Sequence, residues 1–338
     1  MQFKKISELR EGMRLARPIY NKNGVLLFDR DSKITSQGIN SISNFGLIGL
    51  FILEPAEPCP PMTPEDIEFE RFQTINVFAL TEEIKKISVQ GKQSRLPFIV
   101  SGILKNYGHL DDKINFNQNL RSSEDANIKH ALNVAMLAAM MCNRLNVKIE
   151  ERMDILSSAL LRGNIPIANV EQMFLASPNI RRFILQADKL EEAIQIGGMP
   201  EGGVKIMPGG RILAVADIFD NMTAMNLDKE PESEVATVKF LLSHADILDK
   251  TVIMALVDSI NILVPGVCVE LSTGSKALVL NENRLDLFRP MVLGFGTNEV
   301  MDLSDMNAFG DVEILDIMKT MDNRHVIDTN ALANFGIK

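Results

Sequence analysis

RILAVADIFDNMTA, residues 211–224, decides the fold, because it combines an almost continuous apolar run with one carboxylate in its middle. It begins directly after the helix breaker MPGG at 207–210 and has the pattern of a buried helix. A buried carboxylate is costly unless a metal ion, a cation or hydrogen bonds hold it. The stretch therefore predicts a helix inside a globular α-helical domain and marks Asp217 as a candidate site residue.

Helical patterns extend on both sides of this stretch, from about residue 65 to residue 262. Apolar residues at helical spacing predict helices in 64–91, 127–147 and 148–165, and one or two more in 233–263. Ahead of them, five prolines between positions 55 and 64 indicate a linker over 57–64. The helical domain is accordingly expected to cover residues 65–338.

Residues 1–56 have the pattern of a small mixed α/β domain. RLARPIY (14–20) and GVLLFD (24–29) are short β-type runs, and the Asn and Gly between them suit a tight hairpin. A short helix is expected in 35–46, with Thr35 or Ser36 as its cap and Gly46 as its stop, followed by a strand in 47–53.

In the C-terminal part of the sequence, the spacing of apolar residues changes from the helical to the strand period. VCVEL (267–271) and KALVL (276–280) alternate around the turn STGS, which predicts a β-hairpin. DVEILDIMKTMD (311–322) resembles one more amphipathic helix, which would pack on the helical domain or against a second copy of the chain as a homodimer. The predicted fold class is therefore mainly α, with a C-terminal hairpin and a small N-terminal α+β domain.

Composition narrows the range of functions. The 338 residues carry a formal net charge of -9, from 44 acidic and 35 basic residues, so no general attraction to nucleic acid or to an anionic membrane is expected. The three cysteines lie far apart without CxxC spacing, which suits a reducing compartment. No signal peptide or membrane span is expected, and the predicted location is cytoplasmic.

Two residues mark a candidate site inside the helical domain. Among the four histidines only His130 lies in a strongly apolar helix, and only Asp217 is a carboxylate in a comparable setting. A helical histidine is commonly an ordinary core residue, and a catalytic metal ion needs at least three protein ligands. The pair alone is therefore an incomplete metal signal.

The order of several motifs along the chain gives information about the fold that the His130–Asp217 pair alone does not give. HALNVAMLAAMM, ILSSALL, GGMPEG, GGRILAVADIFDNMTA and LVPGVCVELSTGSKALVLNENRLDLFRP follow one another within residues 120–293. This succession resembles the HD-GYP family, bacterial phosphodiesterases that hydrolyse cyclic di-GMP. Residues 6–35 look like the small domain often found ahead of it. The resemblance implies an HD-type helical bundle whose pocket holds two or three metal ions, usually iron or manganese.

The resemblance also implies where the metal ligands should lie, and most of them are missing. His130 matches the first metal-binding histidine and Asp217 the aspartate of the family's VAD helix. The family's His-Asp pair falls on Arg162 and Gly163, which cannot act as metal ligands. Its His-His-Glu and Gly-Tyr-Pro motifs fall on Leu190, Glu191 and Glu192 and on Gly198, Met199 and Pro200.

We therefore expect no metal or other cofactor at this site, and a different way of neutralising Asp217. The hypothesis is that Arg162 enters the vacated metal pocket and pairs with Asp217. The candidate pocket residues are Arg162, Glu191, Glu192, Met199 and Asp220. The alternative is an oxygen-rich site for magnesium or manganese, formed by His130 and Asp217 with Asp154, Asp188, Glu191 and Glu192.

Three functions stay open at this point. The first is a catalytically inactive HD-GYP-like protein that acts as a signalling or protein-interaction module in cyclic di-GMP pathways, with diguanylate cyclase (GGDEF) domain proteins as partners. The second is a sensor that binds cyclic di-GMP or another nucleotide without cleaving it. The third is a metal-dependent phosphodiesterase with a remodelled carboxylate site. A P-loop, a GxSxG elbow and a basic nucleic-acid-binding stripe are all missing from the sequence.

Overall fold

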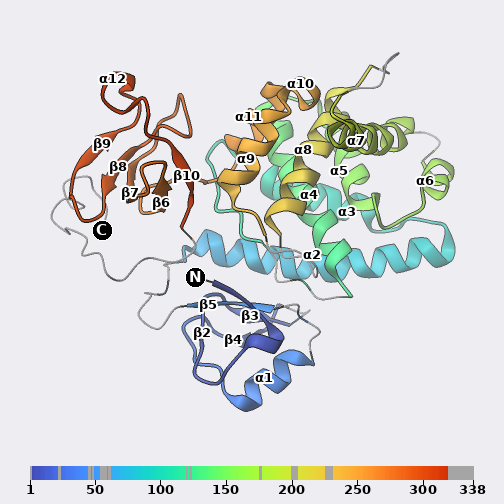
Figure 1. Ribbon diagram of the computed structural model, residues 1–338. Coiled ribbons are helices and arrows are strands. Elements are labelled where there is room, and N and C mark those ends of the chain that lie inside the picture. Colours follow the sequence, from blue (N-terminus) through green and yellow to red (C-terminus); the bar gives the residue numbers. More distant parts are fainter. Residues whose placement is uncertain are drawn as a thin grey trace.

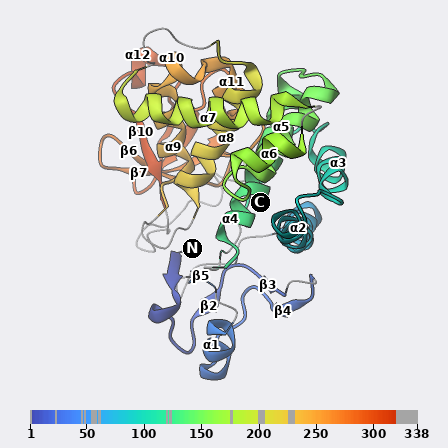
Figure 2. The same ribbon diagram turned by 90° about the vertical axis from the view of Figure 1, so that its right-hand side faces the viewer.

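The computed structural model describes residues 2–21, 24–44, 47, 49–53, 59, 62–118, 121, 124–174, 177–198, 205–224 and 231–318. The chain is mainly α. Figure 1 shows three parts: a small N-terminal unit, a helical bundle above it, and a C-terminal β-sheet beside the bundle. After a quarter turn, in Figure 2, the N-terminal unit still lies below the bundle.

The N-terminal unit has a small apolar core of its own, which includes Leu15, Ile42 and Leu50. Its main sheet has the antiparallel order β1-β5-β2, and β3 and β4 form the predicted hairpin. Helix α1 begins after Thr35, whose hydroxyl accepts a hydrogen bond from the Gly38 N–H as expected of a cap. The elements are β1 (Gln2–Lys5), a 3-10 turn (Ile6–Glu8), β2 (Arg14–Leu15), β3 (Ile19–Tyr20), β4 (Leu26–Phe28), α1 (Ser36–Ser43) and β5 (Gly49–Leu53).

Two expectations for this unit need correction. RLARPIY does not form one strand, because it divides into β2, which pairs with β5, and β3, which pairs with β4. Strand β1 went unpredicted, since it becomes a strand by pairing with β5, some fifty residues later in the chain. The predicted stop at Gly46 lies outside the described residues.

The bundle is built around α4, which is buried on every face from Ala131 to Cys142 and contacts α2, α3, α5, α8 and α11. The predicted helices over 64–91, 127–147, 148–165 and 211–224 are confirmed, whereas α3, α6 and α7 went unpredicted. The helices are α2 (Pro64–Gln90), α3 (Leu96–Tyr107), α4 (Ala126–Arg144), α5 (Ile149–Leu161), α6 (Ile167–Met173), α7 (Pro178–Ile196), α8 (Pro208–Thr223), α9 (Glu234–Ser243), α10 (Ala245–Leu248) and α11 (Lys250–Val257).

Polar side chains fix the residues at which two helices of the bundle begin. A reciprocal pair of hydrogen bonds between Thr63 and Asp66 caps α2, so the helix begins at Pro64, inside the predicted linker. The buried carboxylate of Glu83, on α2, accepts hydrogen bonds from the N–H groups of Arg95 and Leu96 and thereby caps α3 from outside.

The C-terminal sheet is larger than the predicted hairpin. Strands β6 (Cys268–Leu271) and β7 (Lys276–Asn281) pair as expected, and the full antiparallel order is β10-β6-β7-β8-β9. The other elements are β8 (Met291–Gly294), β9 (Val300–Asp302), α12 (Met306–Phe309) and β10 (Ile314–Ile317). Its inner residues belong to the same apolar core as the bundle.

The helix predicted over 311–322 is wrong where the structure describes it. Residues 314–317 form β10, which adds to the edge of β6, and Ile314 is buried while Leu315 is half exposed. Such alternation is the strand period, and it is too short here to be distinguished from a helix in sequence. The remainder of that stretch, 319–322, lies outside the described residues.

Candidate functional site

His130 and Asp217 meet at the contact between α4 and α8. The His130 Nε2 atom lies 2.9 Å from Asp217 Oδ1. Asp220, one turn further along α8, reaches the other ring nitrogen, with 2.6 Å between Nδ1 and Asp220 Oδ2. Residues three apart share one face of a helix, so both carboxylates face the imidazole.

This geometry fixes the charge of His130. A neutral imidazole carries one N–H, whereas His130 has a carboxylate oxygen at each nitrogen, so only the imidazolium donates to both. Burial alone would lower the pKa of His130, but the hydrogen bonds to Asp217 and Asp220 raise it to about 9. His130 is therefore a partly buried cation at neutral pH.

Arg162 lies at the end of α5 and forms the predicted ion pair with Asp217. Its guanidinium also binds two carboxylates of α7, with Nε 2.9 Å from Asp188 Oδ1 and Nη2 2.8 Å from Glu191 Oε2. Only 15% of the Arg162 side chain is exposed. The predicted pairing of Arg162 with Asp217 is confirmed, whereas the idea that this arginine occupies a former metal pocket stays a prediction.

Asp220 is completely buried and has its own cation. Arg121 forms an ion pair with Asp220 Oδ2, and Asn133 Nδ2 donates to Oδ1 over 2.8 Å. Burial acts to raise the pKa of Asp220, but Arg121, His130 and Asn133 together lower it to about 2. In the same way, His130 and Arg162 outweigh burial and hold the pKa of Asp217 below its usual value.

A second set of amides continues the network away from α8. Asn133 Nδ2 also donates to Gln118 Oε1 over 2.9 Å, and Gln73 Nε2 donates to Asn133 Oδ1 over 3.1 Å. Gln118 Nε2 in turn donates to the Thr223 hydroxyl over 2.8 Å. The network therefore joins α2, α4 and α8 through buried side chains.

Four residues of the network were not predicted from the sequence: Arg121, Asn133, Gln118 and Gln73. A signal existed for Asn133, because it is polar, lies in the most apolar helix and falls one turn after His130. Arg121 had no comparable signal, since its partner Asp220 is 99 residues away in sequence.

Of the other predicted pocket residues, the structure places some at the site and others away from it. Glu191 belongs to the site, and burial together with Asp217 raises its pKa to about 7, against the opposing effect of Arg162. Glu192 is exposed and takes part in none of these contacts, because adjacent residues of a helix point in different directions. The Asp154 carboxylate lies apart from these contacts, with its Oδ2 atom 3.5 Å from Asn179 Nδ2. Met199 lies outside the described residues.

At the positions where the resemblance implies metal ligands, the donor atoms do not fit a metal centre in this arrangement. Both His130 nitrogens carry protons directed at carboxylates, so neither offers a lone pair. Asp217 Oδ1 is bound by His130 and Arg162, and its Oδ2 accepts a 2.7 Å hydrogen bond from Asn221. Among the described residues, no group of three or more His, Cys, Asp or Glu side chains is placed to hold an ion.

Comparison of the chain with protein-family models, curated proteins and solved structures gives no match. The HD-GYP resemblance therefore still depends on the motifs alone. In the described part of the chain, every helix is too short or too polar to cross a lipid bilayer.

Proposed function

We propose that this chain is a non-catalytic HD-GYP-like module that acts by binding other proteins in cyclic di-GMP signalling. One observation carries the proposal: protein cations, Arg162 and the His130 imidazolium, hold the carboxylate that the family uses as a metal ligand. The motif order supports an HD-type bundle, and the ion network supports a structural role for what would be its catalytic centre.

The charges within the network explain why it is structural. Three cations, His130, Arg121 and Arg162, face Asp217 and Asp220, with Glu191 at the edge. Nucleophilic water in such enzymes is activated by a metal ion that lowers its pKa. An arginine supplies positive charge but has no open coordination position, so it neutralises Asp217 without activating water.

The resemblance suggests which partners to test first. Diguanylate cyclase (GGDEF) domain proteins make the nucleotide that the family's enzymes degrade. A module with the same bundle and no hydrolysis would regulate or localise such a partner. The sensor and the remodelled phosphodiesterase are the competing outcomes of the experiments below.

The first experiment measures hydrolysis. The full chain, purified without chelators, is incubated with cyclic di-GMP and added Mn²⁺ or Fe²⁺, and the linear product is quantified. We expect no turnover by the wild-type chain. Hydrolysis that disappears in His130→Ala, together with one bound ion per chain in metal analysis, would establish the phosphodiesterase instead.

The second experiment measures binding. Purified diguanylate cyclase domains are titrated against the full chain by calorimetry, and cyclic di-GMP is titrated separately. A complex with the protein partner and no heat from the nucleotide is expected. Micromolar binding of cyclic di-GMP alone would replace the interaction module by a nucleotide sensor.

A further inference from the structure

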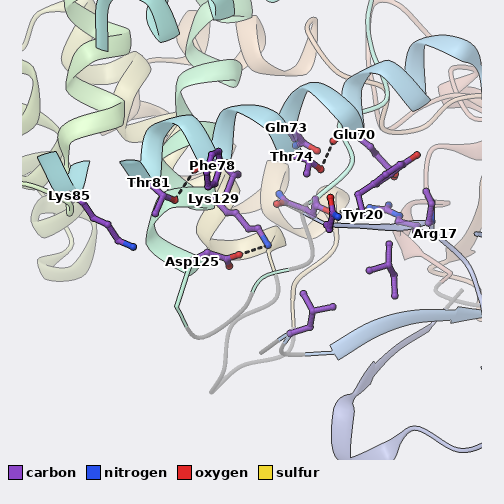
Figure 3. Close-up of a pocket in the computed structure, with 16 residues that line it drawn as sticks. Arg17, Tyr20, Glu70, Gln73, Thr74, Phe78, Thr81, Lys85, Asp125 and Lys129 are labelled. Carbon is purple, nitrogen blue, oxygen red and sulfur yellow. Dashed lines mark hydrogen bonds and ion pairs between the residues drawn. The ribbon is translucent and has the colours of Figure 1, made fainter. Parts of the chain in front are cut away.

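A cavity of about 560 Å³ lies between the N-terminal unit and the bundle, outside the ion network. Its walls are residues 17–21 and Leu47 of the N-terminal unit, one face of α2, and Asp125 and Lys129 at the start of α4. Figure 3 shows Glu70, Tyr20 and Arg17 at one end, Lys85 at the other, and Lys129 between them. The volume is in the range typical of small-molecule sites.

The α2 wall has an apolar middle and polar ends. Its lining residues recur at three- and four-residue spacing, which places them on one face of the helix: Glu70, Gln73, Thr74, Val77, Phe78, Thr81 and Lys85. Val77 and Phe78 line the cavity together with Ile19 and Leu47 of the N-terminal unit. From Glu70 to Lys85 the helix rises about 22 Å, so the cavity is elongated.

The charges in the cavity favour an anion. Lys129 is only 14% exposed and contacts Asp125 at 2.8 Å, whereas Lys85 is exposed and has no ion pair with any described residue. Arg17 is a third cation of the lining. Burial raises the pKa of Glu70, the other acidic residue here, to about 7, although Arg17 opposes the shift. Positive charge therefore exceeds negative charge in the cavity near neutral pH.

The walls are held in place before any ligand arrives. Arg17 donates 3.0 Å hydrogen bonds to Gln118 O and Asn117 Oδ1, and its guanidinium lies 4.5 Å from the centre of the Phe51 ring. Gln73 and Gln118, which also line the cavity, are fixed through Asn133 to the buried network. Rigid walls reduce the entropy cost of binding.

We propose that this cavity binds a small organic anion with an aromatic body. The anionic group, a carboxylate or a phosphate, lies between Lys129 and Lys85. The body packs on Phe78, Val77 and the apolar side chains of the N-terminal unit, with its far end near the Tyr20 hydroxyl. The proposal does not depend on the protein-interaction function, since it is argued from the lining of the cavity alone.

The test uses three probes that differ only in the polar group: 2-naphthoate, 2-naphthyl phosphate and the uncharged 2-naphthylmethanol. Binding to the full chain is followed by ligand-observed NMR and by calorimetry. We expect at least one anion to bind in the micromolar to millimolar range, and the alcohol to bind about tenfold more weakly or not at all. The stronger of the two anions identifies the carboxylate or the phosphate as the natural group.

Substitutions of the lining residues test whether the probe binds in the cavity. Lys129→Met is expected to weaken the anion about tenfold, and Lys85→Met, at an exposed position where folding is not at risk, about threefold. Phe78→Ala should also weaken it, by removing the aromatic wall. Lys86→Met is the matched control, because Lys86 bonds Ser94 instead and does not line the cavity.

Three results would overturn the proposal. They are no binding of either anion at millimolar concentration, equal binding of the alcohol, and equal affinity in the Lys85, Phe78 and Lys86 variants. Circular dichroism of each variant shows whether a lost affinity reflects lost folding, and the exposed Lys85 position keeps the comparison interpretable.

Discussion

His130 has a carboxylate at each ring nitrogen, and the same pocket holds Arg162, so two cations share Asp217. At the scale of single residues, the site is an ion network in which each charge depends on its neighbours. Buried pairs of this kind contribute little net stability relative to apolar residues, but removing one partner leaves an uncompensated charge. This asymmetry gives two testable predictions.

Arg162→Met should destabilise the chain by roughly 2–4 kcal/mol, because Asp217 and Glu191 lose their shared cation inside the protein. Urea unfolding measures the change. Adding Asp217→Asn to Arg162→Met should recover part of the loss, since the unpaired charge is removed. Arg181→Met is the control: Arg181 pairs with Glu171 on the surface and should cost no more than about 1 kcal/mol. Equal costs for the two arginines would contradict the network.

The raised pKa of His130 predicts a loss of stability at alkaline pH. Because the folded-state pKa is raised from 6.5 to about 9, the contribution is complete below pH 6.5 and is lost as pH rises through 9. Its size is at most about 3 kcal/mol. Glu191 and Glu70, whose pKa values are raised from 4.5 to about 7, also lose stability as pH rises, but they do so as pH passes through 7. Above about pH 8 the remaining loss is therefore mainly that of His130.

His130→Gln should flatten the unfolding free energy between about pH 8 and pH 9, as measured by denaturant titration at a series of pH values. Asp217 keeps Arg162 and Asp220 keeps Arg121 in this variant, so the fold is retained. Parallel curves for the variant and the wild-type chain would mean that His130 is neutral in the folded state.

At the scale of elements, the close contact of α8 with α7 depends on two glycines. A Cβ atom at Gly209 would lie 2.7 Å from the Phe183 ring, and one at Gly210 would lie 2.7 Å from Gln186. The MPGG sequence was interpreted as a helix breaker, but Pro208, Gly209 and Gly210 are the first turn of α8. They bring the helix that carries Asp217 close to the helix that carries Glu191.

Gly209→Ala should therefore destabilise the chain by about 1–3 kcal/mol, through overlap with a fully buried aromatic ring. The matched control is Gly102→Ala in the interior of α3, where no atom lies within 4 Å of the added Cβ. That change should stabilise by about 0.5–1 kcal/mol, because alanine is the better helix former. The thermal unfolding temperatures of the two variants should shift in opposite directions. A shift of the same sign would contradict the close contact of Gly209 with the Phe183 ring.

The elements also show what sequence patterns can predict. Helices α2, α4, α5 and α8 were predictable, because in each of them apolar residues recur at helical spacing over a long stretch of sequence. Helix α7 went unpredicted although Ile180, Phe183 and Ile184 are buried at helical spacing. Ser177 provides no side-chain cap that would mark its start. The pair Arg162–Asp217 could be predicted because the HD-GYP resemblance puts an arginine where it implies a metal ligand. Arg121–Asp220 could not, because only the fold brings these residues together.

At the scale of the whole molecule, the N-terminal unit is joined to the bundle by more than the linker. Arg17 reaches across to Gln118 and Asn117, which precede α4, and Gln118 continues into the network around Asp220. The cavity of Figure 3 lies beside this contact. Docking of the small unit, the shape of the cavity and the buried network are therefore physically connected.

Arg17→Met should loosen this docking while leaving the bundle folded. Two hydrogen bonds to a charged group and the contact with the Phe51 ring are lost, which amounts to roughly 3 kcal/mol or more. Because the small unit has its own core, we expect hydrogen exchange to rise at residues 14–20 and 117–118, with unchanged protection in α4 and α8. Arg10→Met, at an exposed position of the same unit, should leave exchange as in the wild-type chain. Uniform protection in Arg17→Met would show that Arg17 does not hold the two parts together.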